Sequence, residues 1–164
     1  MAGRITKSDQ QLRPDPRYAD KILAKFINSV MHAGKKSVAQ RLVYTALDEI
    51  QGKLDKDKSE NLPKTAIDIF HQAINNVRPA VEVRSRRVGG ANYQVPMSVT
   101  TRRRQSLAFR WIIHAARSDS GKPMHMRLAR ELYDAACGEG KAMATRSNTH
   151  RMAEANKAFA HFAW

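Results

Sequence analysis

The spacing of apolar residues along the chain predicts a mainly helical protein. Apolar positions recur three and four residues apart in six segments, and each such stripe forms the buried face of one predicted helix. Turn and stop residues (glycine, proline and runs of charge) separate the segments. The six stripes run from Ile22 to Met31, Val38 to Ile50, Ile67 to Val77, Leu107 to Ala115, Met124 to Ala135 and Met152 to Phe162.

Two helix starts can be predicted from single residues. Pro63 suits the first turn of the third helix, because proline fixes φ and has no N–H to leave unpaired there. Thr100 or Thr101 can cap the fourth helix. The sixth helix is expected to continue to the C-terminal Trp164, with Met152 on its inward face.

Between residues 80 and 99 the spacing of the apolar residues changes from a helical period to strict alternation. The runs VEVRSR and YQVPMSV alternate in polarity on either side of Gly89-Gly90, which predicts a β-hairpin with the two glycines as its turn. In that register Arg84 and Arg86 share a face with Tyr93 and Val95. The predicted fold is therefore mainly α: a six-helix domain over residues 18–164 with one protruding β-hairpin at about 80–99, preceded by a basic N-terminal arm over residues 1–17.

The charge balance indicates a polyanionic partner. The chain has 29 Lys+Arg against 15 Asp+Glu, a net charge of +14. No apolar run approaches the roughly 20 residues of a membrane span, and the N-terminus lacks the apolar core of a secretory signal. We therefore expect a soluble protein that remains in the compartment where it is made.

The type of charge favours nucleic acid over a membrane surface. From Arg78 to Arg117 there are nine arginines, no lysine and one acid, Glu82, a net +8. Guanidinium groups make bidentate contacts to phosphate and stack on bases. Arg103, Arg110 and Arg117 stand seven apart, which predicts one helical stripe along a phosphate backbone. The alternatives are a solvated face and edge arginines that block aggregation, but solvated faces usually mix signs, as residues 48–60 do.

No pattern indicates catalysis, a metal or another cofactor. Cys137 is the only cysteine, so the chain has no internal disulfide, and we expect this thiol to pack as a small hydrophobe. His150 and Glu154 lie four apart, which favours a local ion pair over a metal site two ligands short. Gly89-Gly90 lacks the context of a nucleotide-binding loop. The chain is therefore not expected to be an enzyme.

Several long segments resemble one known family. They are LRPDPRYADKILAKFINSVMHAGKKSVAQRLVY, PAVEVRSRRVGGANYQVPMSV followed by RRRQSLAFRW, and THRMAEANKAFAHFAW. Over about residues 12–164 the chain resembles the bacterial-type family of protein seven of the small ribosomal subunit. The resemblance implies a helical protein with an extended hairpin that binds the 3′ major (head) domain of the ribosomal RNA and nucleates head assembly.

The resemblance also implies partners and contact residues. The hairpin and C-terminal helix would lie near the exit-site tRNA and the mRNA exit channel, beside small-subunit protein eleven. The N-terminal arm and the run before the last helix are less basic than is usual in the family. The residues implied to contact rRNA are Arg4, Lys7, Arg13, Lys35, Lys36, Arg78, Arg102, Arg103, Arg104, Arg110, Arg117, Arg151 and Lys157, and those implied near tRNA and mRNA are Arg84, Arg86, Arg87, Gly89, Gly90, Tyr93 and His150.

Two other classes of function compete with this one. An architectural DNA-binding protein also uses a basic β-ribbon, but usually with an apolar wedge at the tip, where this chain has Gly89-Gly90. A nuclease using His114 or His150 would lack acidic metal ligands. A ribosomal role places the protein in the cytoplasm, and an origin in an organelle that encodes its own protein fits the sequence equally well.

Overall fold

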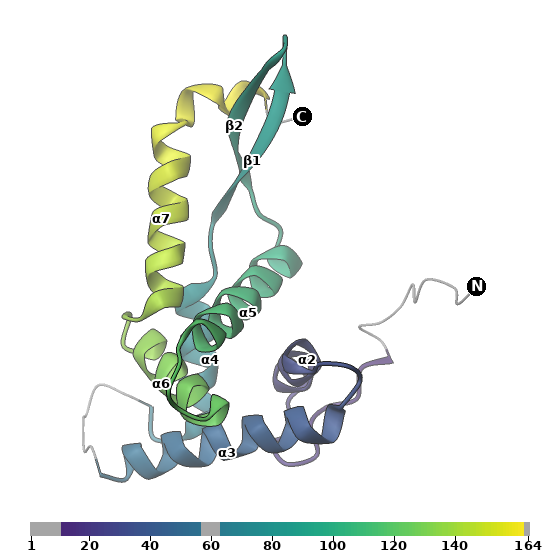
Figure 1. The fold of residues 1–164 in the computed structure, drawn as a ribbon, viewed down its shortest axis with the longest axis vertical. Coiled ribbons are helices and arrows are strands. Elements are labelled where there is room, and N and C mark those ends of the chain that lie inside the picture. The colour runs from purple at the N-terminus through teal and green to yellow at the C-terminus, as the bar shows by residue number, and fades with distance from the viewer. Residues whose placement is uncertain (1–10, 57–62, 163–164) are drawn as a thin grey trace.

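The computed structural model describes residues 11–56 and 63–162, and its fold is mainly α, as predicted (Figure 1). The predicted β-hairpin is confirmed as the two-stranded sheet of this part of the chain. The helices are α2 (Lys21–Val30), α3 (Lys36–Leu54), α4 (Ala66–Val77), α5 (Thr101–Ser118), α6 (Met124–Ala136), α7 (Lys141–Ala155) and the 3-10 helix η1 (Lys157–Phe162), and the strands are β1 (Val81–Val88) and β2 (Ala91–Ser98).

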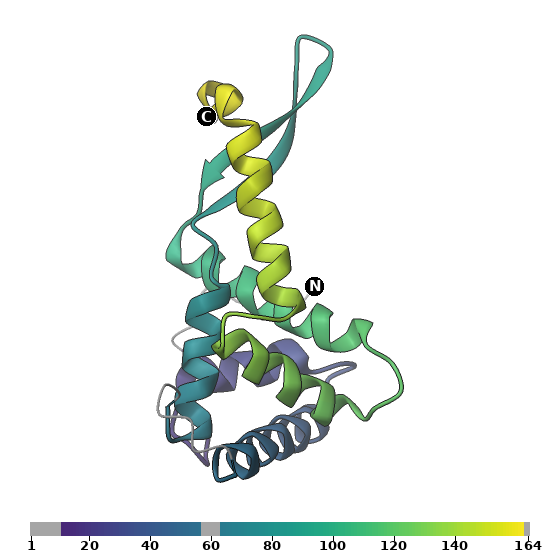
Figure 2. The same ribbon diagram turned by 90° about the vertical axis from the view of Figure 1, so that its left-hand side faces the viewer.

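The helices and the hairpin form an elongated molecule. Helices α2 to α6 make up a body, from which α7 and the hairpin project side by side in the same direction (Figures 1 and 2). Helix α7 packs against both strands, and η1 packs against β2. The projecting part of the molecule is therefore a hairpin supported along its length by a helix.

The core of the body confirms most positions of the predicted apolar stripes, but the prediction for Val38 is wrong, because this first residue of the second stripe is 59% exposed in the first turn of α3. Phe26 of α2 lies at its centre, with its ring edge-on to Phe70 of α4 at 5.3 Å and to Phe109 of α5 at 5.2 Å between centroids. Leu128 and Leu132 of α6 are fully buried beside them. Burial of each such side chain contributes about 1.5–3 kcal/mol. This packing fixes α2 and α5 relative to each other.

Helix α4 begins later in the chain than the position of Pro63 predicted. Thr65 is the N-cap, and its hydroxyl oxygen accepts a hydrogen bond from the backbone N–H of Asp68 at 3.3 Å. Pro63 therefore precedes the helix, and the prediction that it lies in the first turn is wrong. The side-chain cap at Thr65 determines where the helix starts.

The C-terminal segment also differs from its prediction. Helix α7 ends at Ala155, and the side-chain amide of Asn156 donates to the carbonyl of Met152 at 2.8 Å. The chain then turns into η1 instead of continuing as one helix. Met152 is 51% exposed, whereas Ala153 is buried, so the predicted inward position of Met152 is wrong. Trp164 lies outside the described residues.

A buried carboxylate anchors the start of α7. The Glu131 Oε1 atom accepts a hydrogen bond from the backbone N–H of Ala142 at 2.7 Å. Burial raises the pKa of Glu131, although the backbone N–H groups of Ala142 and Lys141 favour its ionised form. Gly140 precedes the helix at φ +93°, and a Cβ atom there would lie 3.0 Å from Oε1. The start of α7 is thus fixed to α6 by a contact that apolar periodicity did not predict.

The described part of the predicted N-terminal arm is attached to α3. The Asp15 carboxylate is buried and accepts hydrogen bonds from the backbone N–H groups of Arg17 and Tyr18 and from the Tyr44 hydroxyl. The Arg17 guanidinium forms an ion pair with Asp48 at 2.6 Å. Residues 1–10 of the arm lie outside the described part, and the boundary at residue 17 remains a prediction.

Candidate nucleic-acid interface

The hairpin has the turn and register that the sequence predicted. Gly89 and Gly90 both have positive φ, at +57° and +88°, as a two-residue hairpin turn of type I′ requires. Arg84 pairs with Val95 and Arg86 with Tyr93 across the antiparallel strands, so these four residues share one face. Arg84 and Arg87 are exposed, whereas Val95 is buried. The hairpin therefore presents arginines while its apolar positions attach it to the rest of the molecule.

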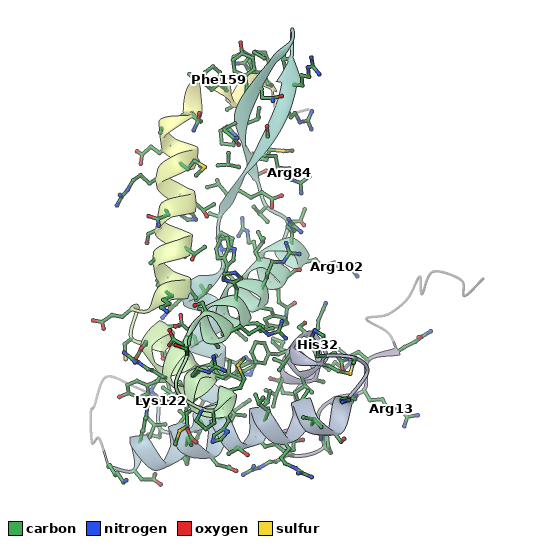
Figure 3. The ribbon with its side chains drawn as sticks, viewed as in Figure 1. Arg13, His32, Arg84, Arg102, Lys122 and Phe159 are labelled. Atoms are coloured by element: carbon green, nitrogen blue, oxygen red, sulfur yellow. The ribbon has the colours of Figure 1, made fainter. Side chains whose placement is uncertain are left out.

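Aromatic rings attach the C-terminal segment to the hairpin. The Tyr93 ring lies 5.1 Å from the Phe159 ring and 5.5 Å from the Phe162 ring, measured between centroids. Figure 3 shows Phe159 beside the upper part of the hairpin. Aromatic pairs at these separations contribute about 0.5–1.5 kcal/mol each beyond their burial. Tyr93 thus holds η1 against β2, a contact between residues far apart in the sequence.

Glu82, the one acid among residues 78–117, joins the hairpin to α5. Its side chain is 12% exposed and accepts from Arg84 Nη2 at 2.5 Å and from Arg103 Nε at 3.1 Å. Burial alone would raise the pKa of Glu82, but the hydrogen bonds and positive charges of Arg103 and Arg84 together lower it below its ordinary value. A single carboxylate therefore ties β1 to the first turn of α5.

The first turn of α5 concentrates positive charge at the positive end of a helix. Arg102, Arg103 and Arg104 lie there, with no acidic residue in that turn. Each cation at a helix N-terminus costs about 0.3–1 kcal/mol where exposed. Glu82 offsets Arg103, and Arg104 Nε donates to the carbonyl of Val99 at 2.9 Å. Arg102 is exposed at the end of α5 nearest the hairpin, where it adds to a surface that favours anions (Figure 3).

The three arginines of the predicted stripe on α5 have different surroundings. Arg103 is bonded to Glu82, Arg110 is exposed, and Arg117 Nη2 donates to the carbonyl of Val30 at the end of α2, at 3.2 Å. Arg110 and Arg117 both line a hollow of about 330 Å³ between α2 and α5. Arg103 and Arg117 therefore hold neighbouring elements in place, whereas Arg110 lies at an open surface.

A second, smaller hollow brings distant basic residues together. Arg117 also lines this hollow of about 190 Å³, together with His32 and Lys35 from the turn before α3. Lys35 and Lys36 are both exposed at the start of α3. The Lys35-Lys36 turn and the end of the α5 stripe, far apart in the sequence, therefore belong to one basic surface.

A third hollow of the body has a different electrostatic character. A hollow of about 420 Å³ there is lined by Glu49 and Asp119 as well as by Lys122 and Arg130 (Figure 3). Asp119 is paired with Lys141, and Arg130 with Asp134. Mixed signs of this kind are usual for a solvated face. The excess of cations without acids lies along α5 and the hairpin instead.

The cationic candidates outside α5 are placed as follows. Arg13 and Arg151 are exposed, and Arg78 Nη1 donates to the side-chain oxygen of Asn75 at 2.8 Å. Lys157 borders a hollow of about 480 Å³ between the base of the hairpin and α7. Arg4 and Lys7 lie outside the described residues.

His150 supports the base of the hairpin. Its Nε2 atom accepts a hydrogen bond from the backbone N–H of Ala80 at 3.2 Å. Burial, together with the positive charge of Arg146, lowers the pKa of His150, which favours the neutral ring that this bond requires. The expected ion pair with Glu154 is therefore wrong, because His150 acts as an acceptor toward the hairpin.

Cys137 is exposed at the end of α6, so the prediction that it packs as a small hydrophobe is wrong. It follows the last helical turn, where Ala135 and Ala136 already fill the buried positions. Local desolvation and the carboxylates of Asp134 and Glu139 raise the pKa of the thiol, which disfavours the nucleophilic thiolate.

Within residues 11–56 and 63–162, no cluster of three or more histidine, cysteine or acidic side chains has the arrangement of a metal site. In the same part of the chain, no helix combines the length and apolar character needed to span a membrane.

Replacing Glu82 by Gln should destabilise the protein by about 1 kcal/mol near neutral pH, because both arginine bonds weaken while the shape is kept. The folded pKa of Glu82 is lowered, so its stabilisation is present above the unfolded pKa of about 4.3 and is lost as the pH falls through the folded value. Urea unfolding over a pH series measures this. Asp48→Asn, which removes an exposed pair, is the control. If Glu82→Gln lowers the free energy of unfolding as much in acid as at neutral pH, the assignment of the two arginine bonds is contradicted.

Comparison with known proteins identifies the family. The family model for ribosomal protein S7p/S5e matches residues 2–157. The small ribosomal subunit protein uS7 of Bordetella pertussis is 53% identical over 164 residues, and that of Paracoccus denitrificans is 49% identical over 164 residues, each over the full length of both chains. The uS7 protein of Rhodopirellula baltica is 53% identical over 99% of both chains. The chain therefore belongs to the ribosomal protein S7p/S5e family, whose members are structural rather than enzymatic.

Proposed function

We propose that this chain is a structural component of the small ribosomal subunit that binds the head domain of the rRNA as a primary binder and nucleates head assembly. The observation that carries the proposal is the full-length similarity to proteins named small ribosomal subunit protein uS7. The concentration of arginine along α5 and the hairpin supports it independently. As a ribosomal component the protein would act in the cytoplasm.

The proposed mechanism is electrostatic anchoring together with recognition of RNA shape. Phosphate oxygens at the first turn of α5 would be attracted both by the arginines there and by the helix N-terminus. Cations that neutralise phosphates also release condensed counterions, which favours binding at low salt. The rRNA contacts we propose are Arg4, Lys7, Arg13, Lys35, Lys36, Arg78, Arg102, Arg103, Arg104, Arg110, Arg117, Arg151 and Lys157.

We propose that the hairpin and the C-terminal helix lie near the exit-site tRNA and the mRNA path, beside small-subunit protein eleven. The support is geometric. The hairpin projects from the body, and three contacts hold it in place: Glu82 and His150 at its base and Tyr93 higher on β2. A supported arm of this kind can reach a second RNA while the body stays bound to the first. The residues concerned are Arg84, Arg86, Arg87, Gly89, Gly90, Tyr93 and His150.

The structure gives little support to the architectural DNA-binding alternative. The exposed tip consists of Gly89 and Gly90, which present no apolar side chain to insert between base pairs. The family match is to ribosomal proteins. Duplex DNA should therefore not displace a head-domain rRNA fragment at equal concentration.

Replacing Arg110 by Ala should weaken binding to a head-domain rRNA fragment and reduce the slope of log affinity against log salt by about 0.7–0.9, the loss expected for one phosphate contact. Filter binding over a series of salt concentrations measures the slope. Arg130→Ala is a matched control, because Arg130 is also a helical surface arginine but pairs with Asp134 and borders a hollow of mixed charge. An unchanged slope in Arg110→Ala, or an equal reduction in Arg130→Ala, would contradict the assignment.

Replacing Arg87 by Glu should leave head assembly intact and weaken retention of exit-site tRNA about tenfold, because one charge-assisted contact at the hairpin is lost. Arg87 is exposed near the tip of the hairpin, where it is separated from the turn by one residue. The test is tRNA dissociation from small subunits reconstituted with the variant, compared with Arg130→Glu. Retention equal to that of wild-type subunits would rule out the tRNA contact at Arg87.

A further inference from the structure

The hollow between α2 and α5 combines an apolar floor with a polar rim. The floor is formed by Phe109 and Ile113, which are 3% and 6% exposed. The rim includes Ser29 from α2 and Ser106 and Arg110 from α5, all exposed. Its volume of about 330 Å³ is within the range of sites that hold small ligands. The hollow can therefore receive a group with one apolar and one polar part.

Packing beneath and beside the hollow keeps its shape. The Phe109 ring is held edge-on against Phe26 of α2, which prevents the floor from filling the space. At one end, Arg117 spans the gap through its bond to the Val30 carbonyl. That bond uses one of the five N–H donors of the guanidinium group. Arg117 is thus fixed in position and still has donors for an anion.

The charge of the hollow selects for anions. None of the residues that line it is acidic, and Arg110, Arg117 and His114 are among them. The hollow near Asp119, by contrast, mixes carboxylates with cations. Cations alone would suit any phosphate group, but an apolar floor adjacent to cations and hydroxyl groups matches a nucleotide, whose base is flat and largely apolar on its faces.

We propose that this hollow holds a single unstacked nucleotide of the bound RNA. Its base would lie on Phe109 and Ile113, and its phosphate at Arg110 and Arg117. The hydroxyl groups of Ser29 and Ser106 would meet the edge of the base or the sugar. This inference rests on the proposed rRNA-binding function and adds that α5 reads a single-stranded position, since a regular duplex keeps its bases stacked and presents only its backbone.

Filling the hollow without changing its charge tests the proposal. Ser106→Trp places a large side chain in it from α5, and Ser29→Trp does so from α2. Ser147→Trp is the matched control, because Ser147 is an exposed serine on helix α7. Binding of each variant to a head-domain rRNA fragment is measured over a series of salt concentrations, and thermal unfolding verifies that each variant is folded. Base-specific alkylation of the RNA then reports which unpaired nucleotides each protein protects.

We expect both hollow-filling variants to bind roughly fivefold to a hundredfold more weakly, the effect of losing one stacked base. The base would be displaced while its phosphate stays at Arg110 and Arg117, so the salt slope should be unchanged. One unpaired nucleotide protected by the wild type and by Ser147→Trp should become reactive. Wild-type affinity in Ser106→Trp and Ser29→Trp would overturn the nucleotide site while leaving the proposed function intact. Failure of the wild type itself to bind the fragment would overturn both.

Discussion

Repulsion among the arginines of residues 78–117 is the constraint on which the rest of the structure depends. Nine cations in this segment accompany one carboxylate, and that carboxylate lies at the junction of the hairpin and α5. Further arginines are held by backbone carbonyls: Arg104 by Val99 and Arg117 by Val30. The carboxylate and carbonyl acceptors therefore bind arginines at the places where two elements meet. Exposed arginines such as Arg110 and Arg87 lie at the open surface.

The projecting arm is stabilised at several levels by contacts of different chemistry. The Glu131 carboxylate fixes the start of α7, His150 bonds the beginning of the hairpin, and Tyr93 packs on Phe159 farther along. Each contact joins residues from different elements. A hairpin of two strands is only marginally stable by itself. The helix beside it and these contacts allow the arginine-rich strands to stand away from the body.

Apolar periodicity predicted most of the fold because burial is the dominant force on these segments. It correctly placed the stripes of α2 to α6, apart from the exposed Val38, and the register of the hairpin. It failed in the C-terminal segment, where Met152 is exposed on α7 and the chain turns after Ala155 so that η1 packs against the hairpin. Glu131 carried a signal that was overlooked, since it is a carboxylate within the buried face that includes Leu128 and Leu132.

The candidate site was predictable in kind but not in detail. The arginine bias indicated a nucleic-acid surface from sequence alone. The partners of Glu82 and the hollow between α2 and α5 depend on which elements become neighbours, and no local pattern gives that information. Likewise, the spacing of Arg103, Arg110 and Arg117 predicted that they share one stripe of the helix. The different role of each arginine depends on the residues that surround it in the fold.

Sedimentation of the native protein is the most direct test of its incorporation into the ribosome. A cell lysate is fractionated through a sucrose gradient at high salt, which removes loosely bound basic proteins because their contacts are mainly to phosphate. A head component held by many contacts and by shape should sediment with the small subunit. Recovery of the protein only in the slowly sedimenting fractions, with intact small subunits elsewhere in the gradient, would contradict a structural role in the ribosome.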